Sequence, residues 1–332
     1  MTNIYVLAVS DLPAPWTRIE TYDGKYLRTT TTTASHGSTG GASQHRHNIP
    51  AGTSGNGTYL NTASALKLAW MPIHSHSTSQ TYSSYSNNDP LYRTYSLWRM
   101  DLTTWETSYG TFPVGCILLA TATVSCTGMS RYSDGDGKLI KLGTPGSTGG
   151  RSTHTDHTAT ITLNTYSGSG SRAYGFSQGA VAESHGHTAT LSSTSSSTVM
   201  PARVQTRMYQ VTGSTPYTPP NVVCFFDDTP SANWTSCGWS GRFIEGADSA
   251  PTNTGSDSHD HTSGDLTSSP YVAAATGEVY GSTPRQTTVS HTHPFTPTID
   301  SESHVPEYVY LCTYYLNTTI YPPKKKAPMF WW

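Results

Sequence analysis

The chain has 332 residues, of which 34% are hydrophobic and only 12% are charged, and its formal net charge is −2. Because the net charge is slightly negative and the sequence has no basic patch, we do not expect nucleic acid as a partner. No apolar run is long enough to span a bilayer. The first residues lack the charged region of a secretory signal peptide. Short β-branched and aromatic runs between Gly, Pro and Asn turns predict an all-β protein with little helix.

Three similar segments follow one another, and such self-similarity indicates an internal repeat. We place segments one, two and three at residues 1–111, 112–218 and 219–318, before a short tail at 319–332. Each opens with an apolar strand, at 4–9, 116–120 and 222–226. A second strand, preceded or opened by Gly, follows at 23–28, 136–141 and 240–245. A Gly-rich stretch comes next and reads Gly-Ser-Thr-Gly-Gly at both 37–41 and 146–150.

Histidine marks the remainder of each segment. Twelve of the fourteen histidines form six close pairs, one early and one late pair in each segment. The early pairs are His45/His47, His154/His157 and His259/His261, and the late pairs are His74/His76, His185/His187 and His291/His293. The second histidine of each late pair lies 14, 14 and 13 residues before Pro90, Pro201 and Pro306. An alternating closing strand follows each of these prolines, at 92–98, 204–209 and 308–314.

The pairs point to metal binding. Residues i and i+2 of a strand share a face, so His-X-His directs two imidazoles toward one point, and imidazole is the commonest protein metal ligand. Three pairs supply six nitrogens, which fill an octahedron, so we expect two transition-metal ions per chain. Six ligands leave no open position, which favours a structural role over catalysis. The donor set favours Fe(II), with Ni(II) or zinc as alternatives; a stacked, metal-free histidine core is the competing interpretation.

Two features depart from the regular pattern. His154-Thr155-Asp156-His157 is one residue longer than His-X-His. A β-bulge could restore both ligands, or Asp156 could contribute an oxygen. His36 and His304 have no equivalents in the other segments, so we expect neither to be a ligand.

The five cysteines are distributed unevenly. Cys116 and Cys126 flank the first turn of segment two, and Cys224 and Cys237 flank the same turn of segment three, whereas segment one has neither. This pattern fits a disulfide or a packed thiol pair in each segment, or separate buried cysteines. Cys312 is left over, in an apolar strand, and is predicted to be a buried free thiol.

No constellation of residues indicates enzyme chemistry. Neighbouring carboxylates such as Asp227 and Asp228 have no base or nucleophile at matching positions and are typical of turns. The Gly-Ser-Thr-Gly-Gly stretch lacks the Gly-Lys-Ser/Thr of a phosphate-binding loop. The chain ends with the apolar residues Phe330, Trp331 and Trp332, which we expect either to dock into a neighbouring molecule or to fold back on their own chain.

Each segment resembles the phage tail collar domain, the receptor-binding region of short tail fibres. Segment three carries the fullest set of motifs, namely Pro230 and Trp234, Gly241-Arg242-Phe243, His259/His261 and Val305-Pro306. Segment one has Pro15-Trp16 and Gly24-Lys25-Tyr26. The resemblance implies intertwined chains whose His-X-His pairs bind metal on a threefold axis. Because three copies lie in one chain, we favour a pseudo-threefold bundle made by a single chain over a homotrimer.

These observations predict a structural, non-enzymatic protein of a phage-like particle, as a tail-tip, tail-fibre or decorating component. Its location would be the virion, and its partners other virion proteins and a host-surface glycan. An extracellular filament subunit or adhesin is the alternative function. A metalloenzyme is the least favoured, because it requires an open metal site.

Overall fold

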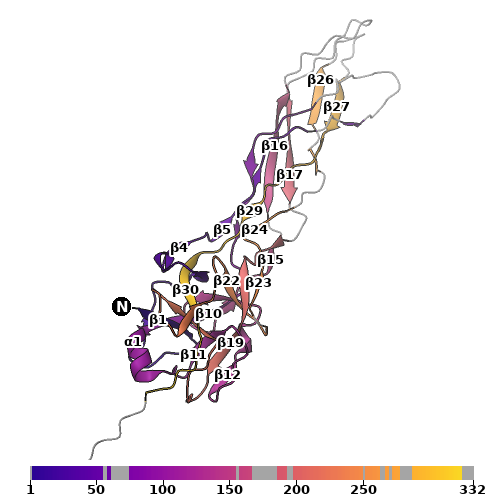
Figure 1. Ribbon diagram of the computed structural model, residues 1–332. Coiled ribbons are helices and arrows are strands. Elements are labelled where there is room, and N and C mark those ends of the chain that lie inside the picture. The colour runs from indigo at the N-terminus through magenta and orange to yellow at the C-terminus, as the bar shows by residue number, and fades with distance from the viewer. Residues whose placement is uncertain are drawn as a thin grey trace, which may run out of the picture.

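The computed structural model describes residues 2–54, 58–60, 75–154, 157–166, 185–192, 197–249, 251–261, 266–268, 271–276 and 286–323. Within these ranges the protein is almost entirely β, and the one α-helix is the short α1 (Leu102–Thr104). A barrel holds the N-terminal strand, and a narrower arm of strands extends away from it (Figure 1). The all-β prediction is therefore confirmed. None of the helices in the described part of the chain has the length and apolar character needed to cross a membrane.

The opening strands of the three segments lie together in the barrel. They are β1 (Asn3–Ala8), β11 (Cys116–Ala120) and β20 (Val222–Phe226). Each pairs antiparallel with the other two, for example Leu7 with Ile117 and Leu119 with Val223. Apart from Asn3, these strands are apolar because both faces are covered: Ile4 and Val6 belong to one buried cluster, and Tyr5 and Leu7 to another.

The closing strands connect different segments. They are β10 (Tyr92–Asp101), β19 (Arg203–Val211) and β30 (Tyr308–Leu316), and each pairs antiparallel with the opening strand of its own segment. On its other side each pairs in parallel with the second strand of a different segment. The parallel pairs are β10 with β13 (Leu139–Leu142), β19 with β22 (Phe243–Gly246), and β30 with β3 (Tyr26–Thr30). The pairings among these nine strands include a closed eight-strand barrel.

The remaining described strands are short or lie in the arm. Beside the barrel run β2 (Thr17–Ile19), β4 (Thr39–Gly40), β12 (Met129–Arg131), β14 (Thr148–Gly149), β21 (Trp234–Ser236) and β23 (Thr252–Thr254). The arm contains the hairpins β16 (Thr158–Tyr166) with β17 (His185–Ser192) and β26 (Tyr271–Thr276) with β27 (Gln286–Thr292), and β7 (Thr58–Leu60) pairs with β27. Two further pairs are β6 (Asn48–Ile49) with β8 (Thr81–Tyr82) and β25 (Leu266–Thr267) with β28 (Pro294–Phe295).

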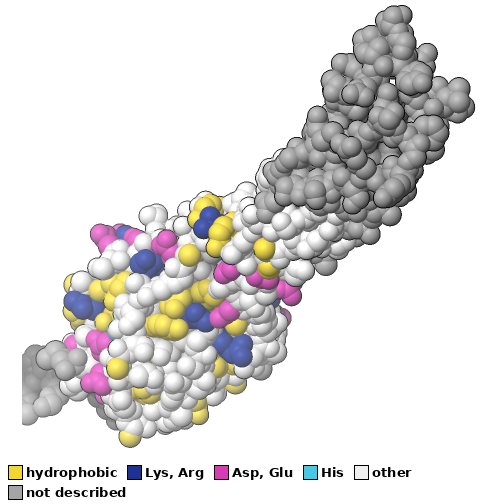
Figure 2. All heavy atoms as spheres, turned by 90° about the horizontal axis from the view of Figure 1, so that it is seen from above, with side chains coloured by type: hydrophobic (Ala, Val, Ile, Leu, Met, Phe, Trp, Pro, Cys, Tyr) yellow, Lys and Arg dark blue, Asp and Glu magenta, His cyan; other side chains and the backbone are white. Residues whose placement is uncertain are grey.

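The surface carries few charges. On the face shown in Figure 2, acidic and basic side chains are interspersed among uncharged polar and apolar ones. Several charged residues form ion pairs, such as Arg18 with Asp23 at 2.7 Å. The tail residues Phe330, Trp331 and Trp332 lie outside the described residues.

All five cysteines are free thiols, so the disulfides that the sequence allowed, Cys116–Cys126 and Cys224–Cys237, are not formed. Cys116 and Cys224 are buried on adjacent strands in one apolar cluster, whereas Cys237 packs against the other cluster. The Cys126 sulfur contacts the carbonyl oxygen of Tyr217 at 3.5 Å. Burial raises the pKa of the Cys237 thiol to about 12. Cys312 is a buried free thiol, as the sequence predicts.

Three glycines sit at matching places where the Gly-rich stretches meet the prolines before the closing strands. Gly41, Gly150 and Gly255 have φ values of +77°, +76° and +78°. A Cβ atom at any of them would collide with a proline carbonyl oxygen, that of Pro90 in the case of Gly150. Both the backbone conformation and the close approach therefore require glycine.

We expect Gly150→Ala to lower the free energy of unfolding by about 2–5 kcal/mol, combining left-handed strain with steric overlap. Gly137→Ala is the matched control, because Gly137 has φ +69° with nothing within 4 Å of the added atom. Gly137→Ala is expected to lower the free energy of unfolding only through the strain of the left-handed backbone, by about 1–2 kcal/mol. Denaturant unfolding of both variants measures the difference, and equal losses would contradict the steric account.

Candidate metal centre

The early histidine pairs begin on three short strands between the barrel and the arm (Figure 1). These strands are β5 (Gln44–His45), β15 (Thr153–His154) and β24 (Ser258–His259). Each is held by a short strand from later in its own segment, namely β9 (Ser86–Asn87), β18 (Ser197–Thr198) and β29 (Glu302–Ser303). Burial alternates along the first pair, since His45 and His47 are buried and Arg46 between them is exposed.

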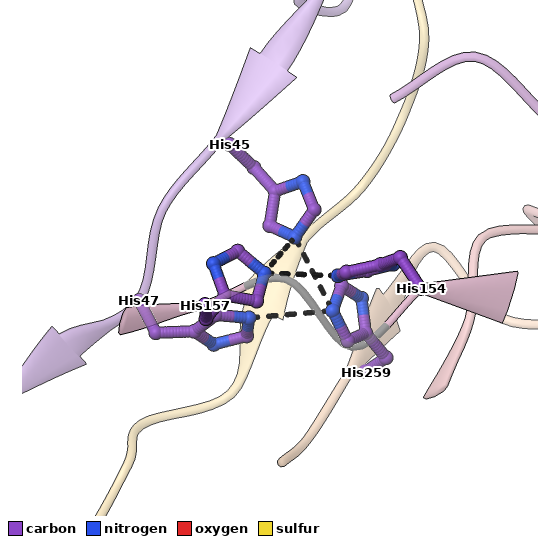
Figure 3. A group of neighbouring side chains, drawn as sticks. All are labelled: His45, His47, His154, His157 and His259. Atoms are coloured by element: carbon purple, nitrogen blue, oxygen red, sulfur yellow. Dashed lines mark hydrogen bonds between the residues drawn. The ribbon is translucent and has the colours of Figure 1, made fainter. Parts of the chain in front are cut away.

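All six early histidines are buried and converge on one point. The ligand atoms of five of them, His45, His47, His154, His157 and His259, lie within 4.8 Å of one another, and Figure 3 shows these five rings pointing inward. His261 completes the group, because its Nε2 lies 3.1 Å from that of His259 and 3.2 Å from that of His154. The predicted early site is therefore assembled from all three segments.

The spacing of the nitrogens is suitable for metal coordination. Nε2···Nε2 separations between neighbouring rings run from 2.9 Å for His154 and His157 to 3.3 Å for His47 and His259. A metal–nitrogen bond of about 2.1 Å places adjacent ligands of an octahedron about 3.0 Å apart and those of a tetrahedron about 3.4 Å apart. The observed separations fall between these two values, and the number of nitrogens, six, is what would fit one six-coordinate ion.

Hydrogen bonding among the rings cannot account for these contacts. Five Nε2 atoms form a closed ring of neighbours, in the order His45, His259, His261, His154 and His157. A neutral imidazole nitrogen either donates or accepts but does not do both. Donors and acceptors cannot alternate around a ring of five, so at least one close contact would be repulsive. A cation at the centre instead attracts every lone pair.

The opposite edge of several rings is fixed by oxygen acceptors. His45 Nδ1 lies 2.5 Å from Asn88 Oδ1, His47 Nδ1 lies 2.8 Å from the carbonyl oxygen of Asp300, and His157 Nδ1 lies 3.0 Å from that of Ser84. Each Nδ1–H donates to its oxygen, which places the proton on Nδ1 and leaves the Nε2 lone pair for a metal.

Three of the rings, those of His45, His154 and His259, are held in the neutral form that metal binding requires. Burial, followed by the neighbouring His157, lowers the pKa of His154 to about 3. Burial lowers the pKa of His45 to about 3, although its hydrogen bond to Asn88 acts in the opposite direction. Burial, followed by the nearby His304, lowers the pKa of His259 to about 2.

The irregular pair in segment two still provides two ligand atoms. Both His154 and His157 direct Nε2 into the cluster, so the additional residue between them is accommodated. Asp156, the alternative oxygen donor, lies outside the described residues.

Three histidines of the late pairs form a second group. His76, His187 and His293 are buried, with ring centroids 4.5–5.0 Å apart, and could together hold a metal ion. His185 lies on β17 and His291 on β27, but their side chains, like the whole of His74, lie outside the described residues. Three of the six predicted late ligands are therefore brought together.

The two histidines expected not to be ligands have different surroundings. His36 packs against Tyr5, with ring centroids 5.2 Å apart. His304 is not among the grouped ligand atoms, yet its Nδ1 lies 2.9 Å from Nδ1 of the ligand-type His259. Sequence reasoning missed this contact and that of Asn88. Strand register is the signal that could have identified them. Asn88 lies two residues after Ser86, which is opposite His45, and His304 lies two residues after Glu302, which is opposite His259.

Comparisons with protein-family models, with curated proteins and with solved structures gave no match to this chain. The fold and the site therefore define its class: it is an all-β barrel protein whose buried histidine clusters could bind metal.

Proposed function

We propose that the protein is a structural component of a phage-like particle, a tail-tip, tail-fibre or decorating protein held together by metal ions. The observation that carries the structural role is the set of six buried Nε2 atoms, drawn from three segments, with neighbouring atoms 2.9–3.3 Å apart. Such a site has no open position for substrate or water. It joins three parts of the chain, and the binding free energy adds to folding stability.

The proposed cofactors are two transition-metal ions per chain, one at the early pairs and one at the late pairs. Six neutral imidazoles favour Fe(II), with Ni(II) or zinc as alternatives. The late site would require His74, His185 and His291 in addition to the three histidines already grouped.

The architecture we propose is a single-chain, pseudo-threefold bundle of three collar-like repeats. Three strand pairings support it. The closing strand of segment one lies beside the second strand of segment two, that of segment two beside the second strand of segment three, and that of segment three beside the second strand of segment one. This cyclic order intertwines the segments, so that no segment completes its own sheet.

Charged residues at the same three junctions support a single chain over a homotrimer. Arg28, Lys141 and Glu245 occupy matching positions on the second strands, and each pairs with a residue of the preceding segment. Lys141 lies 3.1 Å from Asp89, Arg28 lies 2.5 Å from Asp257, and Glu245 pairs with Arg203. At two junctions the second strand carries the cation, Lys141 or Arg28, whereas at the third it carries the anion, Glu245.

A homotrimer would bring equal segments together and mismatch two of these junctions. Lys141 would face Arg203, which occupies the closing-strand position that Tyr92 has beside β13. Glu245 would face Asp257. Like charges in such partly buried positions are unfavourable.

Placement in a virion rests on the resemblance to the tail collar domain and is supported by the barrel-and-arm shape (Figure 1). Antibody labelling of purified particles in the electron microscope tests it, with the label expected at a tail tip, tail fibre or surface projection. Label along cell-surface filaments would instead favour the alternative, a filament subunit or adhesin.

Protein purified without chelators is expected to contain about two transition-metal ions per chain, because the early and late pairs make two clusters. Elemental analysis by mass spectrometry gives both the number and the identity of the ions. Protein never exposed to chelator that carries no transition metal would contradict the proposed cofactors.

A further inference from the structure

Three residues occupy equivalent positions behind the first histidine of each early pair. By register, His45 lies opposite Ser86, His154 opposite Ser197 and His259 opposite Glu302. Two residues further along these strands come Asn88, Val199 and His304. Their backbone N–H groups donate to carbonyl oxygens at matching positions, those of Ser43, Ser152 and Asp257, at 2.9, 2.9 and 3.0 Å. The three positions are therefore equivalent in the fold but differ in chemistry.

Two of the three can accept a hydrogen bond from the ligand histidine. Asn88 Oδ1 lies 2.5 Å from His45 Nδ1, and its orientation is fixed because Asn88 Nδ2 donates to the carbonyl oxygen of Ala42 at 2.9 Å. His304 Nδ1 lies 2.9 Å from His259 Nδ1, but His304 Nε2, which would then carry the proton of His304, is buried without a hydrogen-bond partner among the described residues. Val199 has no acceptor and is completely buried. Correspondingly, His154 Nδ1 is buried and has no hydrogen-bond partner among the described residues.

This difference affects the site only when a metal is bound. A neutral imidazole that binds through Nε2 must carry its proton on Nδ1. At His45 that proton has an acceptor, whereas at His154 it would be buried and unsatisfied, which is unfavourable. At His259 acceptance by His304 only moves the unsatisfied N–H to His304 Nε2. Without metal, His154 can hold its proton on Nε2 and avoid this state.

We propose that Asn88 is a positioning residue for a metal in the early cluster, and that Val199 makes His154 a weaker ligand than His45. Metal exchange then begins at His154 rather than at His45, in the segment that also has the irregular histidine spacing. This inference rests on the metal-stabilised structure proposed above. Acceptors behind metal-bound histidines typically change metal affinity 10- to 100-fold.

The test uses the full chain loaded with zinc and measures zinc release to a chromophoric chelator. Val199→Asn is expected to slow release about tenfold, because it supplies the missing acceptor, and Asn88→Val to accelerate release by about tenfold or more. Val199→Leu is the matched control, since it changes bulk without adding an acceptor.

A second measurement reports the proton itself. NMR of the zinc-loaded protein is expected to show slowly exchanging imidazole Nδ1–H signals, with one more in Val199→Asn and one fewer in Asn88→Val. If Val199→Asn does not fold, Asn88→Val and the double variant Asn88→Val/Val199→Asn, in which the acceptor is moved rather than lost, decide the question.

Two results would overturn the inference in distinguishable ways. Zinc binding by wild type with the same release rate in Val199→Asn, Val199→Leu and Asn88→Val would refute the role of these positions and leave the metal site standing. A wild-type chain that binds no zinc or other transition metal would refute both proposals.

Discussion

Acid is expected to unfold the protein steeply below pH 6.5. In the folded state, burial and neighbouring rings lower the pKa of His45 and His154 to about 3 and that of His259 to about 2, from an ordinary value of 6.5. Between these values the unfolded chain binds protons that the folded chain excludes, so the free energy of unfolding falls as the pH falls. The contribution is fully present above pH 6.5, declines through this window and stops declining below the folded pKa values.

The expected slope is large. Each group contributes up to about 1.4 kcal/mol per pH unit, so the three together contribute up to about 4 kcal/mol per unit. A typical domain is stable by about 5–15 kcal/mol, and the protein should therefore unfold well above pH 3. A bound metal steepens the dependence further, because protons compete with it for the Nε2 lone pairs.

Denaturant unfolding at a series of pH values from 7.5 to about 4, with and without chelator, measures this effect. His154→Ala in chelator-treated protein is expected to lower the slope by about one proton, because one titrating group is removed. Stability that does not change between pH 7 and pH 5 would contradict the buried neutral cluster.

The histidine cluster could be predicted because the spacing of the histidines along the sequence determines how each pair is oriented. His45/His47 and His259/His261 are two residues apart, and the geometry of a strand alone places both rings on one face. The all-β class was equally accessible, since runs such as 116–120 are apolar throughout and are bounded by turn residues.

What could not be predicted depends on which strands become neighbours. Nothing local to β10 indicates that it pairs in parallel with β13 of the following segment. The contact of His259 with His304 spans 45 residues and depends on a register that only the folded sheet defines. The cysteines illustrate the same limit: Cys224 and Cys237 flank one turn, but they pack in different apolar clusters.

Reversing the charge of Glu245 distinguishes the single-chain bundle from a homotrimer by the sign of its effect. In the single chain, Glu245 is buried and pairs with Arg203. Glu245→Lys would place two cations together, and we expect a loss of about 3–5 kcal/mol, the usual consequence of breaking a buried ion pair. Adding Arg203→Glu should recover much of it by restoring an opposite pair.

In a homotrimer the same substitution should stabilise the protein. Lysine at position 245 would then face Tyr308, Tyr310 and Asp257, the surroundings that Arg28 has in the single chain. Glu20→Lys serves as the control for charge reversal, because its ion pair with Arg18 is exposed and should change stability by only about 0–1 kcal/mol. Light scattering of the wild type is expected to give the 35.8 kDa of one chain. A threefold larger mass together with a stabilising Glu245→Lys would overturn the single-chain architecture, because cations are favourable at that junction only if segment three meets copies of itself.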